Sequence, residues 1–121
     1  MAEDRNVTGK LTTPVSLTLS TFDLPWGKWQ TNPSTQVAAG AQGVTVFYAM
    51  GRKGSATGTE GTVTYAAPDG TLFALYFDDP YSSGNNATLT ARNGQAGSYR
   101  CQVDFPRSGN SWVATYTIQK I

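Results

Sequence analysis

The sequence has no histidine among its 121 residues and a single cysteine, Cys101. Histidine is the commonest general base, the usual partner of a catalytic serine and the commonest transition-metal ligand. A lone cysteine cannot form an intrachain disulfide, and one cysteine with carboxylates makes a poor zinc site. We therefore expect a protein that is not an enzyme, with no catalytic residue, no metal site and no cofactor. Cys101 is then a small core residue on a strand.

The sequence also has no large excess of positive or negative charge and no long apolar run. Nine Lys and Arg residues against eight Asp and Glu leave a net charge of +1, too little to draw the protein onto nucleic acid. The longest apolar run, 72–77, is far shorter than the ~20 residues of a spanning helix, and no apolar signal segment follows the first residues. We expect no nucleic-acid partner and synthesis in the cytoplasm without a signal peptide.

The residues that are present are typical of a domain built from short strands. Apolar residues make up 39% of the chain, while 13 glycines and 6 prolines indicate many turns. Apolar and polar residues alternate with a period of two in several segments, as they do in strands with one buried face. These segments are 15–19, 44–50, 99–105 and 112–118. In the second segment, the predicted inward face runs from Val44 through Val46 and Tyr48 to Met50.

The clearest local signal is the turn sequence Pro68-Asp69-Gly70. Proline presets the first turn position, aspartate bonds to the backbone that follows, and glycine accepts a positive φ. We predict a hairpin that pairs 62–66 with 71–77, whose second strand is apolar on both faces and so lies inside its sheet. Together these segments predict an all-β fold, a two-sheet antiparallel β-sandwich that forms a single domain over residues 1–121.

Aromatic residues beside turn-forming residues are the first candidates for binding. Trp26 is followed by Gly27, Lys28 and Trp29, so a loop here could present two indoles with a cation between them. Indole rings favour the headgroup boundary of a membrane, and Lys28 could approach a lipid phosphate. The alternative is that Trp29 only covers the end of the sandwich. Arg52 is a further candidate for contact with phosphate.

A second candidate is the polar segment PYSSGNN at 80–86, in which Tyr81 is surrounded by small residues. Such an exposed loop could bind a lipid headgroup. Tyrosine stacking combined with hydrogen bonds from Asn and Asp also holds sugars in lectins. A glycan-binding, lectin-like module that uses Trp26, Tyr81 and Asn85 is therefore kept as an alternative function.

Glu60 and Asp79 are candidate acceptors of hydrogen bonds from a headgroup amine or hydroxyl. Carboxylates could also form the acid pair of a glycoside hydrolase. The adjacent Asp78 and Asp79 would point to opposite sides of an extended strand, however, so they would not act together on one bond. A small carboxylate enzyme is the least favoured of the three functions.

Several stretches together resemble the aegerolysin family, and most closely the small component of bacterial binary insecticidal proteins. The resemblance begins near Leu17, runs to Ile121, and rests on the order and spacing of four stretches. These are WGKW at 26–29 with Pro33 beyond it, TGTEGT at 57–62 leading into VTY at 63–65, LYFDDPY at 75–81 and TYTIQ at 115–119. The segment 6–13 departs from the family because it is mostly polar, so its strand pairing is left open.

The resemblance implies a β-sandwich that binds sphingolipid-containing or other specific membrane domains. It implies an insecticidal or haemolytic toxin component that needs a larger partner protein, or assembly into a homo-oligomer, to form pores. Such a protein would be made in the bacterial cytoplasm and released to act on a target-cell membrane. Carried over position by position, the implied lipid-binding residues are Trp26, Lys28, Trp29, Glu60, Asp79 and Tyr81.

Overall fold

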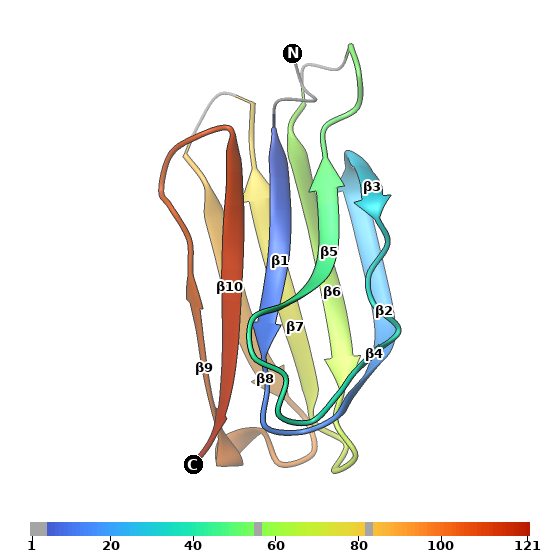
Figure 1. Cartoon of the computed structure of the whole chain (residues 1–121), viewed down its shortest axis with the longest axis vertical. Helices are drawn as coiled ribbons and strands as arrows, with labels where there is room; N and C mark the ends of the chain where they lie inside the picture. The colour runs from blue at the N-terminus through green and yellow to red at the C-terminus, as the bar shows by residue number, and fades with distance from the viewer. Residues whose placement is uncertain (1–4, 55–56, 82–83) are drawn as a thin grey trace.

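The structure is a computed structural model that describes residues 5–54, 57–81 and 84–121. Two five-stranded sheets face each other, as the prediction of a β-sandwich requires (Figure 1). One sheet has the strand order β3-β5-β1-β10-β9 and the other has the order β4-β2-β6-β7-β8. The strands are β1 (Asn6–Thr12), β2 (Leu17–Trp26), β3 (Lys28–Thr31), β4 (Gln36–Val37), β5 (Val44–Met50), β6 (Thr59–Ala66), β7 (Leu72–Asp79), β8 (Asn86–Arg92), β9 (Tyr99–Asp104) and β10 (Ser111–Lys120), with a short 3-10 helix η2 (Ala96–Ser98) before β9.

The sandwich is not wholly antiparallel, because β1 runs parallel to β10. The polar segment whose pairing was left open thus lies inside its sheet, between β5 and β10. Its inward-facing residues Val7 and Leu11 are fully buried, while threonine and lysine point outward. Among the described residues, no helix has the length and apolar character needed to cross a membrane.

The predicted hairpin is confirmed. β6 and β7 pair in antiparallel register up to Ala66 and Leu72, and the backbone N–H of Thr71 donates to Asp69 Oδ1 over 2.9 Å. Gly70 has a φ of +88°, which glycine adopts without strain. In β7 the side chains of Phe73, Leu75 and Phe77 are fully buried and form the centre of the core, and β7 lies inside its sheet between β6 and β8. Alternation also places Trp112, Ala114, Tyr116 and Ile118 of β10 in the core, as predicted.

The alternation predicted for β5 is wrong, because a β-bulge interrupts it. Lys10 of β1 pairs with Thr45 and Gly9 pairs with Phe47, which leaves Val46 as an extra residue on β5. Beyond the bulge the inward positions are therefore Phe47 and Ala49 instead of Tyr48 and Met50. A Cβ on Gly9 would lie 2.2 Å from the Phe47 ring, so glycine is required opposite that ring.

The connection from β2 to β3 is a single residue, Gly27, instead of the predicted loop. β2 and β3 belong to different sheets, so the chain crosses from one sheet to the other at this point. Gly27 has a φ of +108°, and a Cβ there would lie 2.4 Å from Thr59 Oγ1 and 2.6 Å from the Met50 carbonyl oxygen. This tight crossing fixes Trp26 and Lys28 on either side of one edge of the sandwich.

Candidate functional site

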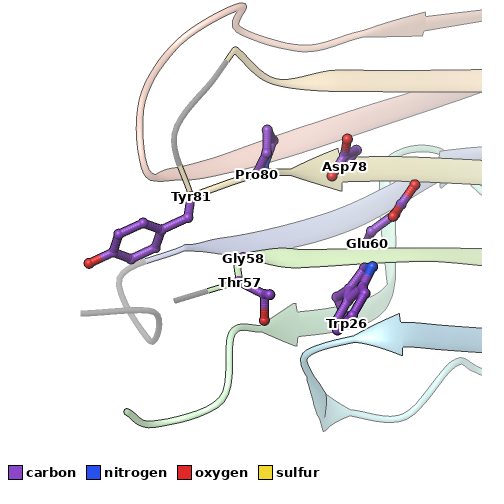
Figure 2. A pocket seen from close by; sticks show the side chains of 7 residues that line it. All are labelled: Trp26, Thr57, Gly58, Glu60, Asp78, Pro80 and Tyr81. Atoms are coloured by element: carbon purple, nitrogen blue, oxygen red, sulfur yellow. The ribbon is translucent and has the colours of Figure 1, made fainter. Parts of the chain in front are cut away.

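Three side chains form a row across the outer face of one sheet. Trp26 of β2 is the register partner of Glu60 on β6, which in turn is the register partner of Asp78 on β7. Residues in register on neighbouring strands point to the same face, here the face opposite the core. Figure 2 shows the Trp26 indole and the Glu60 carboxylate beside one another, with Asp78 on the next strand.

The row lines a cavity of about 300 Å³ near the end of the sandwich. We call it the acidic cavity; it is lined by Trp26, Thr57, Gly58, Glu60, Asp78, Pro80 and Tyr81. Half of the Trp26 side chain, 52%, is exposed to solvent. An exposed indole beside two carboxylates is not needed for the core, and it gives the cavity one apolar wall and one negatively charged wall.

The two carboxylates of the acidic cavity favour a positively charged ligand. Like charges placed directly opposite on antiparallel strands repel one another, and Glu60 faces Asp78 in this way. Desolvation, and next the negative charge of Glu60, raise the pKa of Asp78 above its ordinary value. The Tyr76 hydroxyl donates to Glu60 Oε2 over 2.5 Å and so fixes that carboxylate in place. A bound cation would offset the repulsion, and the face of Trp26 could add a cation–π contact.

Tyr81 lies two residues beyond Asp79, the last residue of β7, where the chain leaves the sheet. Its backbone oxygen accepts a hydrogen bond of 2.6 Å from Arg5 Nη2, and the Arg5 guanidinium lies 5.1 Å from the centre of the Tyr81 ring. Arg5 Nη1 also donates to Asn110 Oδ1 over 2.5 Å. The ring points beyond the strand ends in Figure 2. Of the predicted segment 80–86, residues Ser82 and Ser83 lie outside the described part of the chain.

Asp79 points the opposite way from Asp78, into the sandwich, and none of its surface is exposed. It therefore does not line the acidic cavity, and the carboxylate that does so beside Glu60 is Asp78. Neither Asp79 oxygen, nor the buried Trp112 Nε1, completes a hydrogen bond of good geometry within the described residues, but the Trp112 indole N–H and the Asn6 backbone lie near enough to the Asp79 carboxylate to act on its pKa. Burial raises the pKa of Asp79 to about 7, against the lowering influence of the Trp112 indole and the Arg5 charge.

Trp29 and Lys28 lie on the other side of the Gly27 crossing from the acidic cavity. The Trp29 ring makes edge contacts with Phe47 and Phe77, with centroids 5.7 and 6.1 Å apart, so it covers the core as the alternative interpretation stated. Part of its surface lines a second cavity with Lys28 and Arg52. The structure thus brings together Trp26, Glu60 and Tyr81 of the six predicted residues, and it separates Lys28, Trp29 and Asp79 from them.

Asn85, the amide assigned to sugar binding, is buried, and its Nδ2 donates to the Pro106 carbonyl over 2.9 Å. That hydrogen bond holds the chain after β7 against the chain after β9. In the described part of the molecule, His, Cys, Asp and Glu side chains form no group of three or more that could hold a metal ion.

Comparisons with known proteins agree with this architecture. Residues 12–103 match the model of the Aegerolysin family. The solved structure of RahU protein in complex with a TRIS molecule is similar over 99% of this chain and 98% of that chain, with a TM-score of 0.76 and 21% identity. The lipid binding protein Nakanori aligns over 96% of this chain and 71% of its own, with a TM-score of 0.83 and 13% identity.

The Xerocomus chrysenteron lectin XCL is more distant, with a TM-score of 0.60 and 11% identity over 95% of this chain and 99% of that chain. No curated protein matches the sequence. At such low identities the solved structures establish the fold. The match to the family model extends over most of the chain, from Thr12 at the end of β1 to Val103 within β9, and this protein belongs to the aegerolysin family.

Proposed function

We propose that this protein binds membrane lipids, and that the acidic cavity receives the amine of a lipid headgroup. The observation that carries the proposal is the half-exposed Trp26 in register with the opposed carboxylates of Glu60 and Asp78. An indole ring lies favourably at the boundary between headgroups and acyl chains. A quaternary or primary ammonium group at the same depth would contact the ring face and both carboxylates.

A sphingolipid with a phosphocholine or phosphoethanolamine headgroup has this chemistry. Its amine would enter the acidic cavity, and its phosphate would remain at the rim. Tyr81, which Arg5 holds at the end of β7, lines the same cavity and supplies a second aromatic surface. The family relationship and the lipid binding named for Nakanori support a lipid as the ligand.

We further propose that lipid binding serves a toxin function, as the small component of a binary insecticidal or haemolytic system. The resemblance of the sequence to such components supports this role. In the described residues every strand belongs to the sandwich, so pore formation would require a larger partner protein or assembly of several copies of this chain. Synthesis in a bacterial cytoplasm, followed by release and action on a target-cell membrane, completes the proposal.

The test is cosedimentation with vesicles of matched size and charge. The protein should cosediment with vesicles that contain sphingomyelin or ceramide phosphoethanolamine. It should not cosediment with vesicles whose lipids carry no amine or quaternary ammonium group. Glu60→Gln together with Asp78→Asn should weaken binding to the amine-bearing vesicles. The exposed Val113, on β10 in the opposite sheet, supplies the control variant Val113→Ala. Equal binding to vesicles with and without amines would contradict the proposal.

Glycan binding is the second candidate, and the presence of an exposed tryptophan beside two carboxylates favours it, because sugars also stack on aromatic rings and donate hydrogen bonds to carboxylates. The buried Asn85 counts against it. A glycan array distinguishes the two functions. Binding that a free sugar abolishes and that lipid vesicles leave unchanged would select the glycan and exclude the lipid.

A further inference from the structure

A second cavity lies at the edge of the sandwich where Gly27 joins the two sheets. We call it the edge cavity; it has a volume of about 420 Å³, and its lining includes Phe22, Asp23, Lys28, Trp29, Asn32 and Arg52. Phe22 and Asp23 come from β2, Lys28 and Trp29 come from β3, and Arg52 follows β5. Both sheets therefore contribute to it, and the single-residue crossing at Gly27 fixes their separation.

The floor of the edge cavity is aromatic. Phe22 is 51% exposed, although it belongs to a strand that packs on the core, and its ring meets Trp29 edge to face at 6.1 Å. Trp29 in turn rests on Phe47 and Phe77 of the core, so its ring is held from below. A rigid, exposed apolar floor of this kind can accept the apolar part of a lipid next to its headgroup.

The walls of the edge cavity carry the opposite charge from the acidic cavity. Lys28 and Arg52 contribute two cations against the single carboxylate of Asp23. Arginine binds phosphate oxygens through two parallel N–H donors, and lysine supplies a compact point charge. Asn32 adds an amide that can donate to the same oxygens.

We propose that the edge cavity is a second lipid site, which binds the phosphate of a membrane phospholipid through Lys28 and Arg52 while Phe22 and Trp29 contact its glycerol and acyl carbons. The proposal rests on the proposed function in taking the ligand from a membrane, but it concerns a separate cavity with the opposite charge preference. Trp26 and Trp29 lie on either side of Gly27, so a bilayer that approaches the crossing can meet both cavities.

The three tryptophans allow the two cavities to be observed separately. Trp26 lines the acidic cavity, Trp29 lines the edge cavity, and Trp112 is 4% exposed in the core and serves as an internal reference. The experiment records the three indole N–H signals by NMR, assigned with single Trp→Phe variants, during titration with dihexanoyl phosphatidic acid below its micelle concentration. Ionic strength is held constant with sodium chloride, and inorganic phosphate is titrated in parallel.

We expect the Trp29 signal to move on titration with the short-chain lipid, while the Trp26 and Trp112 signals remain in place. Lys28→Gln with Arg52→Gln should weaken this response by roughly tenfold or more, because the variant removes both cationic donors to the lipid phosphate. Lys53→Gln with Arg100→Gln removes the same two charge types from exposed positions outside the cavity and should leave the response unchanged. Asp23→Asn should strengthen it.

A Trp29 signal that does not move, or that moves equally in the Lys28→Gln and Arg52→Gln double variant, would overturn the edge cavity as a phosphate site. Inorganic phosphate should act at least tenfold more weakly than the lipid. Equal potency would overturn the lipid assignment, because the aromatic floor would then contribute nothing. If the acidic cavity does not bind an amine, sphingomyelin vesicles should leave the Trp26 signal unchanged. The proposed function is thus tested at Trp26, and the edge cavity is tested at Trp29.

Discussion

The two ends of the sandwich hold their carboxylates in opposite ways. At the end formed by the β6–β7 turn, Asp69 accepts hydrogen bonds from the Tyr99 hydroxyl at 2.7 Å and from the Thr71 backbone at 2.9 Å. These bonds, that from Tyr99 first, lower the pKa of Asp69. At the other end Asp79 is fully buried and makes no hydrogen bond of good geometry, and Glu60 on β6 faces Asp78 on the neighbouring strand β7. Figure 1 shows that the sandwich separates the two ends by the full length of its strands.

On the proposed function, this difference distinguishes an end that serves stability from an end that serves binding. The hydrogen bonds that Asp69 accepts from Tyr99 and Thr71 hold the β6–β7 turn in place and so contribute to folding. Opposed carboxylates, a fully buried acid and an exposed tryptophan each cost stability, and such costs concentrate at binding sites.

The largest effect is expected at the buried acid Asp79. The folded protein holds a proton on Asp79 up to about pH 7, whereas the unfolded chain releases it near pH 4. The free energy of unfolding should therefore fall as the pH rises between these values and then become constant. Asp79→Asn should remove this fall and stabilise the protein at pH 8 by on the order of 2–4 kcal/mol. Urea denaturation from pH 4 to pH 8 measures it, and an unchanged pH slope in the variant would refute it.

The second prediction separates binding from stability at Trp26. Trp26→Ala should weaken binding to sphingolipid vesicles by about 1–3 kcal/mol, because the indole loses its burial in the membrane. Its half-exposed position in the free protein means that the free energy of unfolding should change by less than about 0.5 kcal/mol. Vesicle titration and urea denaturation are run on the same preparation. A loss of stability as large as the loss of binding would mean that Trp26 is part of the core.

The third prediction is a pH dependence of binding. A cationic headgroup binds the ionised form of Asp78, whose pKa is raised by desolvation and by Glu60. Affinity for amine-bearing vesicles should consequently fall as the pH falls through that raised pKa. Asp78→Asn should reduce affinity at pH 7 by up to roughly fivefold, the contribution of one exposed ion pair, and should flatten the pH profile. If the Asp78→Asn variant keeps the full pH dependence of binding, a group other than Asp78 is responsible for it.

The smallest effect on binding is expected at the opposite end. Asp69→Ala removes the acceptor of the Tyr99 and Thr71 hydrogen bonds and should lower the melting temperature. Because the folded-state pKa of Asp69 is lowered, its contribution is present above the unfolded pKa and is lost as the pH falls through the folded value. Circular dichroism melts from pH 2 to pH 6 test this slope, which is opposite in sign to that of Asp79. Vesicle binding at pH 7 should remain at the wild-type level.

The sequence predicted those elements in which local signals agree with one another. The β6–β7 hairpin has both a turn sequence and an alternating strand, and β10 alternates without interruption. β1 could not be predicted as a central strand, because its parallel pairing with β10 joins residues about 105 positions apart. The inward face of β5 was missed because its bulge depends on Gly9, a residue of another strand.

Three of the six residues that the sequence predicted for lipid binding, Trp26, Glu60 and Tyr81, line the acidic cavity. Trp26 and Tyr81 were identified by their positions beside turns, and Glu60 by family resemblance. The choice of Asp79 over Asp78 depended on which of two neighbours faces outward, and only the register of β6 with β7 decides that. Lys28 and Trp29 follow Trp26 in sequence, yet the Gly27 crossing takes them to the other sheet.

The central claim is that Trp26 enters the membrane from a folded sandwich. The most direct test is the fluorescence of a protein in which Trp29→Phe and Trp112→Phe leave Trp26 as the remaining tryptophan of the three. Addition of sphingomyelin vesicles should shift its emission to shorter wavelength, and lipids brominated near the headgroup should quench it. Vesicles that bind the protein without shifting or quenching this emission would contradict the account.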